Sequence, residues 1–382
     1  MDTFDRDRLI HVLKQENLPP KVALGPNIVI FGASGLGVNT YKGLTKIGIE
    51  PVAFCDNDER KHGQTIEGKP IMSPEGAVRE FGTEVTYVAA IWSGHFAGYH
   101  FDTIKKQLHK LNCKNVINFP HLYNAFEDVF LPYYSMDRMN RMLEQKDEIL
   151  EAYDLMSDTM SQELFVRQVC WRKTLDDWYF DEPIKEDPYF CNDLYLYKDN
   201  EVFVDCGAYT GDTIMDYLAV KGDCFSRIVA FEPDESNFIQ LKGYVGTLEE
   251  RIKRKIEIHR AGVGDKNEVV RFSSNGELDS FVCQDGEVEI SCVRLDDHLK
   301  GVNPTVIKMD IEGYEQKALM GSRNIISSNS PLLSICVYHR QSDLWRVPLL
   351  IHEMNRSYKL HIRQHLHQCW DTVCYAIPND RK

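Results

Sequence analysis

Three acidic residues in the second half of the chain stand at the ends of apolar, strand-like runs. Asp205 ends "VFVD", Glu232 ends "IVAFE" and Asp310 ends "VIKMD". In an open sheet of parallel strands the carboxyl ends of neighbouring strands meet at one edge, and ligands bind there. We therefore expect these three carboxylates to line one ligand site.

A glycine-containing turn follows Asp205 in "VFVDCGAYTGDT". Gly207 would let the backbone approach a ligand closely, and Gly211 would let the next helix pack near the strand. The N-terminus of that helix offers backbone N–H groups that have no partner within the helix. The pattern predicts a strand–turn–helix unit that binds a nucleoside-containing cofactor.

The two carboxylates beside this turn favour one cofactor over another. Glu232 is placed to accept hydrogen bonds from two ribose hydroxyls, which NAD and S-adenosylmethionine both carry. A carboxylate at Asp205 would repel the pyrophosphate of NAD but attract the cationic amino-acid end of S-adenosylmethionine. Electrostatics therefore favours S-adenosylmethionine, and the alternative is a solvated Asp205 beside an ordinary turn.

Methyl transfer to a hydroxyl needs a positioned acceptor and a general base. His339 follows the run "SICVY", and neutral imidazole is a suitable base near pH 7. We predict His339 as the base, Asp310 as the residue that faces the methyl group, and Arg340 as a ligand for the acceptor. The alternatives are a structural His339, a helix-capping Asp310 and a surface ion pair of Arg340.

Four motifs in this half, "VFVDCGAYTGDT", "IVAFEPDESNFIQL", "AGVGD" and "VIKMDIEGYEQKALMGS", resemble those of the FkbM family of methyltransferases in order and spacing. The resemblance covers roughly residues 157 to 378. It implies S-adenosylmethionine-dependent O-methylation of a sugar or another hydroxylated small molecule, on a seven-stranded sheet. By matching position it implies that Glu232 binds the ribose, that Asp265 lies near the adenine, and that the methionine end is framed by Asp205, Gly207, Ala208, Tyr209 and Gly211. Asp310, at the end of its strand, completes the predicted cofactor site.

The C-terminal run "HIRQHLH" adds further candidates. Because the family often carries Arg and His near this strand, Arg363 and His365 are expected to contact the substrate, and the alternative is plain exposure to solvent. No Cys or carboxylate completes a recognisable ligand spacing with these histidines, so no metal site is predicted.

A second glycine turn lies near the N-terminus, in "NIVIFGASGLG". This region resembles the small Rossmann domains of sugar-modifying transferases, such as sialic-acid and bacillosamine-type acetyltransferases, over about residues 26 to 120. The resemblance implies a nucleotide or nucleotide-sugar site. Its residues would be Gly32, Ser34, Gly35, Gly37 and the ribose-binding acid Asp56.

The chain is expected to be an α/β protein with two doubly wound domains. Alternation of strand-like and helix-like segments predicts a Rossmann-like domain over 1–125 and a methyltransferase domain over 186–382. Helical spacing of apolar residues predicts a helical connector over 126–185. In the second domain the expected strands are Val202–Asp205, Ile228–Phe231, Ile256–His259, Thr305–Met309, Leu332–Tyr338, Tyr358–Arg363 and Thr372–Ile377, with a hairpin over Phe281–Leu295.

Composition restricts the partners. A net charge of −14 argues against nucleic acid and anionic membrane surfaces, and no apolar run is long enough to span a membrane. The 11 cysteines are scattered singly and the N-terminus lacks a secretory signal, which predicts a reduced, cytoplasmic protein. Two other functions stay open, an NAD-dependent oxidoreductase or epimerase and a non-catalytic module that binds nucleotide-sugars. The sequence leaves the acceptor and the oligomeric state undetermined.

Overall fold

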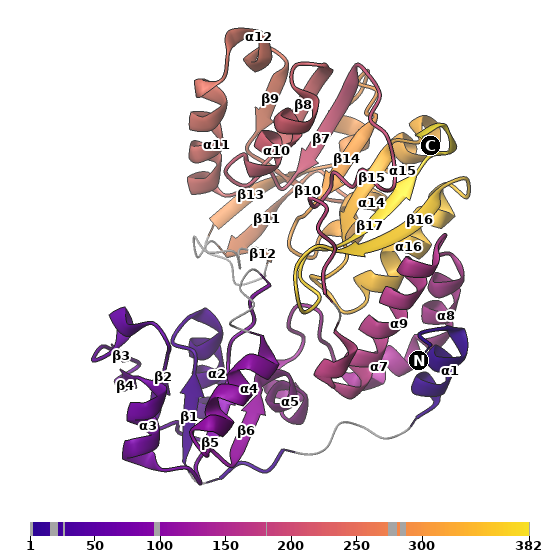
Figure 1. Ribbon diagram of the computed structural model, residues 1–382. Coiled ribbons are helices and arrows are strands. Elements are labelled where there is room, and N and C mark those ends of the chain that lie inside the picture. Colours follow the sequence, from indigo (N-terminus) through magenta and orange to yellow (C-terminus); the bar gives the residue numbers. More distant parts are fainter. Residues whose placement is uncertain are drawn as a thin grey trace. The chain divides into compact units, whose positions relative to one another are not determined.

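The computed structural model describes residues 3–15, 22–25, 27–94, 100–180, 182–273, 281–282 and 288–381. The chain divides into two compact α/β units (Figure 1). The first contains residues 1–146, 166–183 and 366–370, and the second contains residues 147–165, 184–365 and 371–382. Of the predicted connector over 126–185, residues 126–146 and 166–183 belong to the first unit, and residues 147–165 and 184–185 belong to the second. One of the boundaries falls inside helix α9 (Thr159–Thr174).

The first unit contains a six-stranded sheet in the order β3-β4-β2-β1-β5-β6. Pairing is parallel throughout, except between β3 and β4. All four residues of β1 are buried, as expected for a central strand covered on both faces. The strands are β1 (Ile28–Phe31), β2 (Ala53–Cys55), β3 (Thr65–Ile66), β4 (Lys69–Met72), β5 (Thr86–Ala89) and β6 (Asn115–Asn118).

Helices connect these strands in the alternation that the sequence predicts. Helix α2 (Gly35–Lys46) follows β1, α3 (Pro74–Phe81) follows β4, and α4 (Phe101–Lys110) follows β5. The remaining helices of this unit stand before and after the sheet in the chain. They are α1 (Arg6–Lys14), α5 (Phe119–Ala125), α6 (Glu127–Phe130) and α7 (Met139–Glu144).

The second unit contains the expected seven-stranded sheet, in the order β16-β17-β15-β14-β7-β8-β9. Six of these strands run in the same direction, and β17 runs in the opposite direction between β16 and β15. All seven predicted strands are confirmed, with ends that differ by a few residues. They are β7 (Glu201–Cys206), β8 (Phe225–Phe231), β9 (Ile256–His259), β14 (Val306–Met309), β15 (Leu332–Cys336), β16 (Lys359–Gln364) and β17 (Thr372–Ile377).

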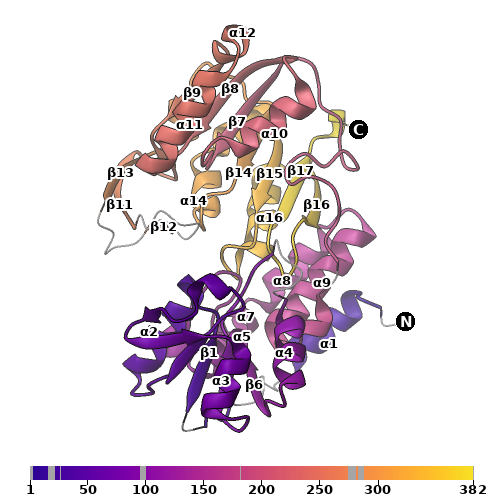
Figure 2. The same ribbon diagram turned by 60° about the vertical axis from the view of Figure 1, so that its left-hand side comes forward.

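Strand order reverses between β7 and β14. The chain moves outward from β7 to β9 and then returns to β14 on the other side of β7. Because parallel crossovers are right-handed, the helices of the two halves must lie on opposite faces of the sheet. Helices α10 (Asp212–Lys221) and α11 (Glu235–Thr247) cover one face, and α14 (Glu315–Met320), α15 (Arg323–Asn329) and α16 (Asp343–Met354) cover the other (Figure 1 and Figure 2). The point of reversal is where doubly wound sheets bind ligands.

A small four-stranded sheet has the order β10-β13-β11-β12. The hairpin predicted over Phe281–Leu295 is wrong, because β12 (Phe281–Val282) and β13 (Val288–Val293) each pair with β11 (Glu268–Ser273) and not with each other. The unpredicted strand β11 offers five paired positions to β13 and so separates the two segments. The proposed turn at Asp285-Gly286 lies outside the described residues. Strand β10 (Gly262–Val263) completes the sheet.

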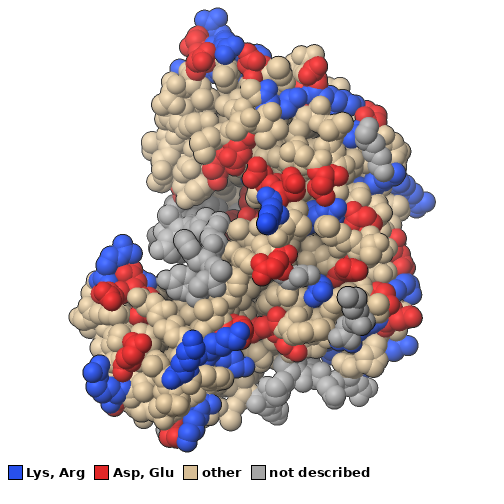
Figure 3. All heavy atoms as spheres, viewed as in Figure 1, with Lys and Arg blue, Asp and Glu red and all other residues tan. Residues whose placement is uncertain are grey.

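None of the helices that the structure describes has the length and apolar character needed to cross a membrane. On the face seen in Figure 3, acidic and basic side chains are interspersed over the described surface.

Candidate functional site

The turn after β7 contains two glycines, Gly207 and Gly211, and both have positive φ. A Cβ atom on Gly207, which has φ +86, would lie 1.8 Å from the backbone oxygen of Asp310, so no other residue fits there without rearrangement. The N–H groups of Gly207 and Ala208 donate hydrogen bonds of 2.9 and 3.0 Å to the carbonyl of Phe231. Gly211 stands directly before α10. The turn therefore lies between the carboxyl ends of β8 and β14.

Glu232 lies at the carboxyl end of β8, beside the same turn. Its buried carboxylate accepts hydrogen bonds from the backbone N–H of Tyr209, at 2.9 Å, and of Asp234, at 2.8 Å. Burial raises the pKa of Glu232 to about 7, even though both hydrogen bonds favour the charged form. A buried carboxylate with few partners is suited to accept hydrogen bonds from ligand hydroxyls.

Asp205 has a charged partner that the sequence analysis missed. Its carboxylate, fully buried, lies 3.1 Å from the ammonium group of Lys308, which is also buried and donates to the carbonyl of Gly207 at 2.6 Å. Strands β7 and β14 place these two residues opposite each other in the parallel register. The charge that was expected to face a cationic cofactor is thus balanced within the sheet. The available signal was one lysine inside the apolar run "VIKMD".

Carboxylates surround His339, just beyond β15. Its Nδ1 lies 2.8 Å from Glu315 Oε1, while Nε2 lies 3.2 Å from Asp310 Oδ1 and 3.5 Å from Glu312 Oε2. The imidazole side chain is 2% exposed, whereas the carboxylates of Asp310 and Glu312 are 25% and 31% exposed. The structure therefore brings the two predicted catalytic residues together, with their acidic neighbours, at the reversal point of the sheet.

This environment changes the expected chemistry of His339. Burial lowers the pKa of the imidazole, but the charges of Glu315 and Glu312 outweigh burial and hold the pKa well above 6.5. Burial likewise opposes ionisation of Asp310, but contact with His339 and the charge of Lys308 lower its pKa. Both shifts favour an imidazolium beside a carboxylate. His339 as the base stays a prediction, and the carboxylates around it, which the sequence did not reveal, act against the neutral form that a base needs.

Two tyrosines contact Asp310, and a further acidic residue, Asp371, lies at the same edge of the sheet. The hydroxyl of Tyr189 donates to Asp310 Oδ2 at 2.8 Å, and the hydroxyl of Tyr338 lies 3.4 Å from Oδ1. Asp371 immediately precedes β17, and because β17 is antiparallel its start lies at the edge where β14 and β15 end. Burial and the charge of Asp310 raise the pKa of Asp371 to about 7. The sequence analysis missed these three residues. Tyr189 and Asp371 do not follow a parallel strand of this sheet, whereas Tyr338 lies beside His339 after β15 and was missed for lack of an ionisable side chain near neutral pH.

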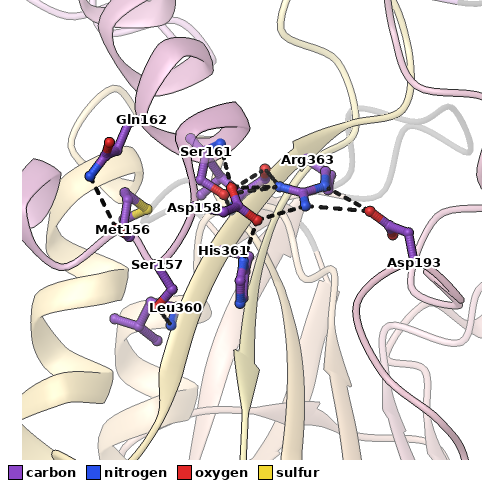
Figure 4. A network of polar contacts seen from close by, with 10 residues as sticks. Met156, Ser157, Asp158, Ser161, Gln162, Asp193, Leu360, His361 and Arg363 are labelled. Atoms are coloured by element: carbon purple, nitrogen blue, oxygen red, sulfur yellow. Dashed lines mark hydrogen bonds and ion pairs between the residues drawn. The ribbon is translucent and has the colours of Figure 1, made fainter. Parts of the chain in front are cut away.

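The two C-terminal substrate candidates are engaged in internal contacts. The buried Arg363 lies 2.9 Å from Asp158 Oδ2 and 3.4 Å from Asp193 Oδ2 (Figure 4). His365 contacts the carbonyl oxygen of Glu186 at 2.8 Å and the hydroxyl of Tyr375 at 2.7 Å. These contacts account for both side chains without a substrate.

The last two predicted residues of the second unit, Arg340 and Asp265, lie at different places. Arg340 is exposed directly after His339, and its side chain lies over Gly313, whose added Cβ would be 2.7 Å from Nε. Arg340 thus lies beside the loop of Asp310 and Glu312. These two residues, with Glu315 and Asp371, are called the acidic group below. Asp265 is half-buried and follows β10, which belongs to the small sheet and not to the seven-stranded one.

The first unit repeats the same local arrangement. A Cβ atom on Gly37 would lie 1.8 Å from the carbonyl oxygen of Gly32, so α2 packs tightly against the turn. Asp56 is buried after β2, where it accepts hydrogen bonds from the Ala33 N–H at 2.8 Å and from the Lys61 ammonium at 2.9 Å. The other residues of the predicted site lie at the start of this helix, with Ser34 before it and Gly35 as its first residue.

Comparison with known proteins agrees with this arrangement. The family described as "Methyltransferase FkbM domain" matches residues 205–371. No curated protein matches the chain. The crystal structure of methyltransferase FkbM from Methylobacillus flagellatus KT is 23% identical, with a TM-score of 0.75 over 97% of this chain and 92% of that chain. UDP-D-quinovosamine 4-dehydrogenase from Vibrio fischeri is also 23% identical, over 28% of this chain and 86% of that chain, but its TM-score is only 0.21.

The matched segment extends from Asp205 to Asp371, so its first and last residues are both acidic residues of the site described above. The solved structure from Methylobacillus flagellatus shares the fold over almost the whole chain. Residues 205–371 of this chain are therefore similar to the methyltransferase FkbM domain, and almost the whole chain shares its fold with a solved FkbM structure.

Proposed function

We propose that the protein is an S-adenosylmethionine-dependent O-methyltransferase that acts on a hydroxyl group of a sugar-like small molecule. One observation carries the proposal. At the reversal point of the seven-stranded sheet, a turn without side chains at Gly207 lies between the buried carboxylate of Glu232 and the acidic group around Asp310. A cofactor site and an acceptor site would thus be neighbours.

The residues beside the turn fit S-adenosylmethionine. Glu232 would accept hydrogen bonds from the ribose, and the turn from Gly207 to Gly211 would hold the methionine end. Asp205 would act on that end together with Lys308, because the two charges form one buried pair. Asp265 would line the adenine side. When bound, the cofactor supplies an electrophilic methyl group on a sulfonium centre.

The acidic group would handle the acceptor. An attacking hydroxyl must lose its proton, and the group that takes it should have a pKa near the working pH. The pKa of Asp371, at about 7, meets this condition better than that of the imidazolium His339. We assign proton removal to the carboxylate of Asp371, and Asp310 would orient the acceptor. Arg340 would bind polar groups of the acceptor, and His339 would keep Asp310 in place.

The first unit would bind a nucleotide or a nucleotide-sugar at the turn from Gly32 to Gly37. A ligand ribose there would compete with Ala33 and Lys61 for the carboxylate of Asp56. The ten cysteines that the structure describes are free thiols, which supports function in a reducing compartment such as the cytoplasm.

Separate titrations of the purified protein with S-adenosylmethionine, NAD and nucleotide-sugars would test the proposal. We expect S-adenosylmethionine to bind, with affinity lost in Glu232→Ala and retained in Asp56→Ala. Transfer of a radiolabelled methyl group to a panel of sugars and nucleotide-sugars would then identify the acceptor. Binding of NAD at Asp56 without binding of S-adenosylmethionine would instead favour the oxidoreductase.

A further inference from the structure

Three metal-binding side chains converge from two segments of the second unit. Asp310 and Glu312 belong to the loop after β14, and His339 follows β15. One ligand atom from each lies within 4.8 Å of the others. Glu312 has φ +54, a left-handed conformation that is uncommon for a residue other than glycine and is found at functional sites.

The orientation of His339 resembles that of a metal ligand. Its Nδ1 is held 2.8 Å from Glu315 Oε1, and Glu315 Oε1 is itself held by the N–H of Ile311 at 2.9 Å. This leaves Nε2 as the nitrogen that faces Asp310 and Glu312. Metal-binding histidines commonly contact a carboxylate through the other ring nitrogen, which fixes the direction of the ring. Glu315 is fully buried, so the ring is held from the protein interior.

The separations between these atoms fit a shared cation. Metal–ligand bonds of about 2.1 Å place adjacent ligand atoms about 3.0 Å apart in an octahedral site and about 3.4 Å apart in a tetrahedral one. The observed separations from His339 Nε2 are 3.2 Å to Asp310 and 3.5 Å to Glu312. Both carboxylates are partly exposed, so a cation and an additional ligand could reach them from solvent.

We propose that Asp310, Glu312 and His339 bind a divalent cation, which would replace the proton on His339 Nε2 and release it to solvent, with Glu315 orienting the imidazole. Two carboxylates and one imidazole suit a hard or borderline ion such as Mn²⁺ or Mg²⁺. The proposal departs from the expectation of no metal, because that expectation considered only the C-terminal histidines. A cation here would draw an acceptor oxygen to the acidic group as a Lewis acid. That use rests on the proposed function, whereas cation binding does not.

Titration of the purified full chain with Mn²⁺, followed by electron paramagnetic resonance without S-adenosylmethionine, tests the proposal. We expect one Mn²⁺ per chain, competed by Mg²⁺. Glu312→Gln should weaken Mn²⁺ binding at least tenfold, and Glu315→Gln should weaken it about 10- to 100-fold through the ring orientation. Glu250→Gln, an exposed carboxylate in α12 (Glu250–Lys253), is the matched control and should change nothing.

Two results would overturn the cation site. One is a folded wild-type protein that binds no Mn²⁺ at millimolar concentration, which would leave a plain ion-paired histidine. The other is unchanged Mn²⁺ binding in Glu312→Gln, which would place the ion elsewhere. Because Glu312 is partly exposed, this variant is expected to fold, and circular dichroism would verify that. Mn²⁺ binding without any methyl transfer would reject the proposed function and leave the cation site standing.

Discussion

Glu232 Oε2 accepts a hydrogen bond of 2.9 Å from the backbone N–H of Tyr209, so the carboxylate after the second strand fixes the turn after the first. The first unit has the same relationship between Asp56 and the N–H of Ala33, at 2.8 Å. In both, a carboxylate fixes the shape of a glycine turn. They differ in charge balance. Asp56 has the Lys61 ammonium group at 2.9 Å, whereas the partners described for the Glu232 carboxylate are backbone N–H groups.

Binding of S-adenosylmethionine should depend on pH through Glu232. Ribose hydroxyls donate hydrogen bonds to the ionised carboxylate, but the pKa of Glu232 without ligand is raised to about 7. Below that pH a proton must leave before the ligand binds, so affinity should fall as pH decreases, by up to about tenfold per pH unit. Calorimetry at pH 6, 7 and 8 measures this. Glu232→Gln should bind more weakly and with a flatter pH dependence, and a wild-type affinity that is constant over this range would refute the assignment.

Lys308→Met should strongly destabilise the second unit. It would leave Asp205 as an uncompensated buried charge, and loss of one partner from a buried ion pair costs about 3–5 kcal/mol. The double variant Asp205→Asn/Lys308→Met should recover much of this loss, because no charge then stays buried. Denaturation by urea measures the free energy of unfolding. Lys242→Met, at an exposed position of α11, is the control, and an equal effect of both lysine variants would contradict the ion pair.

Gly207→Ala should damage the cofactor site. The new Cβ would lie 1.8 Å from the Asp310 carbonyl oxygen, and the φ of +86 is unfavourable for alanine. We expect a loss of more than about 1 kcal/mol in stability and loss of S-adenosylmethionine binding. Gly243→Ala in α11 provides the matched control, since no atom lies within 4 Å of its added Cβ. That substitution should gain about 0.5–1 kcal/mol, and equal binding by both variants would exclude Gly207 from the site.

Asp158 should stabilise the protein most above pH 4. Burial opposes its ionisation, but contacts with His361 and Arg363 outweigh burial and lower its pKa below 3.8. A lowered pKa in the folded state gives a stabilisation that is present above the unfolded pKa and is lost as pH falls through the folded one. Asp158→Asn should cost about 1–3 kcal/mol at pH 7, less than for a fully buried pair, because Asp193 stays near Arg363.

Thermal unfolding of Asp158→Asn and Asp193→Asn at pH 7 and pH 3 checks this. The more exposed Asp193, 3.4 Å from Arg363, should contribute less than about 1 kcal/mol. The difference between wild type and Asp158→Asn should shrink at pH 3, where the unfolded state holds a proton on Asp158. A difference that does not change with pH would show that the network of Figure 4 acts through packing and not through charge.

Much of the second unit follows from local sequence. Its seven strands are short apolar runs separated by helices, so periodicity and length were sufficient to predict them. The strand-end acids Asp205, Glu232 and Asp310 lie where the sequence placed them, because parallel strands point their carboxyl ends to one edge. The predicted hairpin failed for a related reason. In the small sheet β12 and β13 both pair with β11 and not with each other, and the local pattern of 281–295 carries no information on a partner outside that segment.

The sequence by itself determined the fold class, the position of the glycine turn after Asp205 and the identity of the FkbM-like motifs, since these depend on neighbours in the chain. Only the tertiary structure decided which charges meet. Lys308 comes to Asp205 through strand register, Glu312 and Glu315 enclose His339 through a loop and a helix start, and Asp371 arrives through an antiparallel strand. Burial and long-range charge set the protonation of a side chain, and both depend on residues that are distant in the sequence.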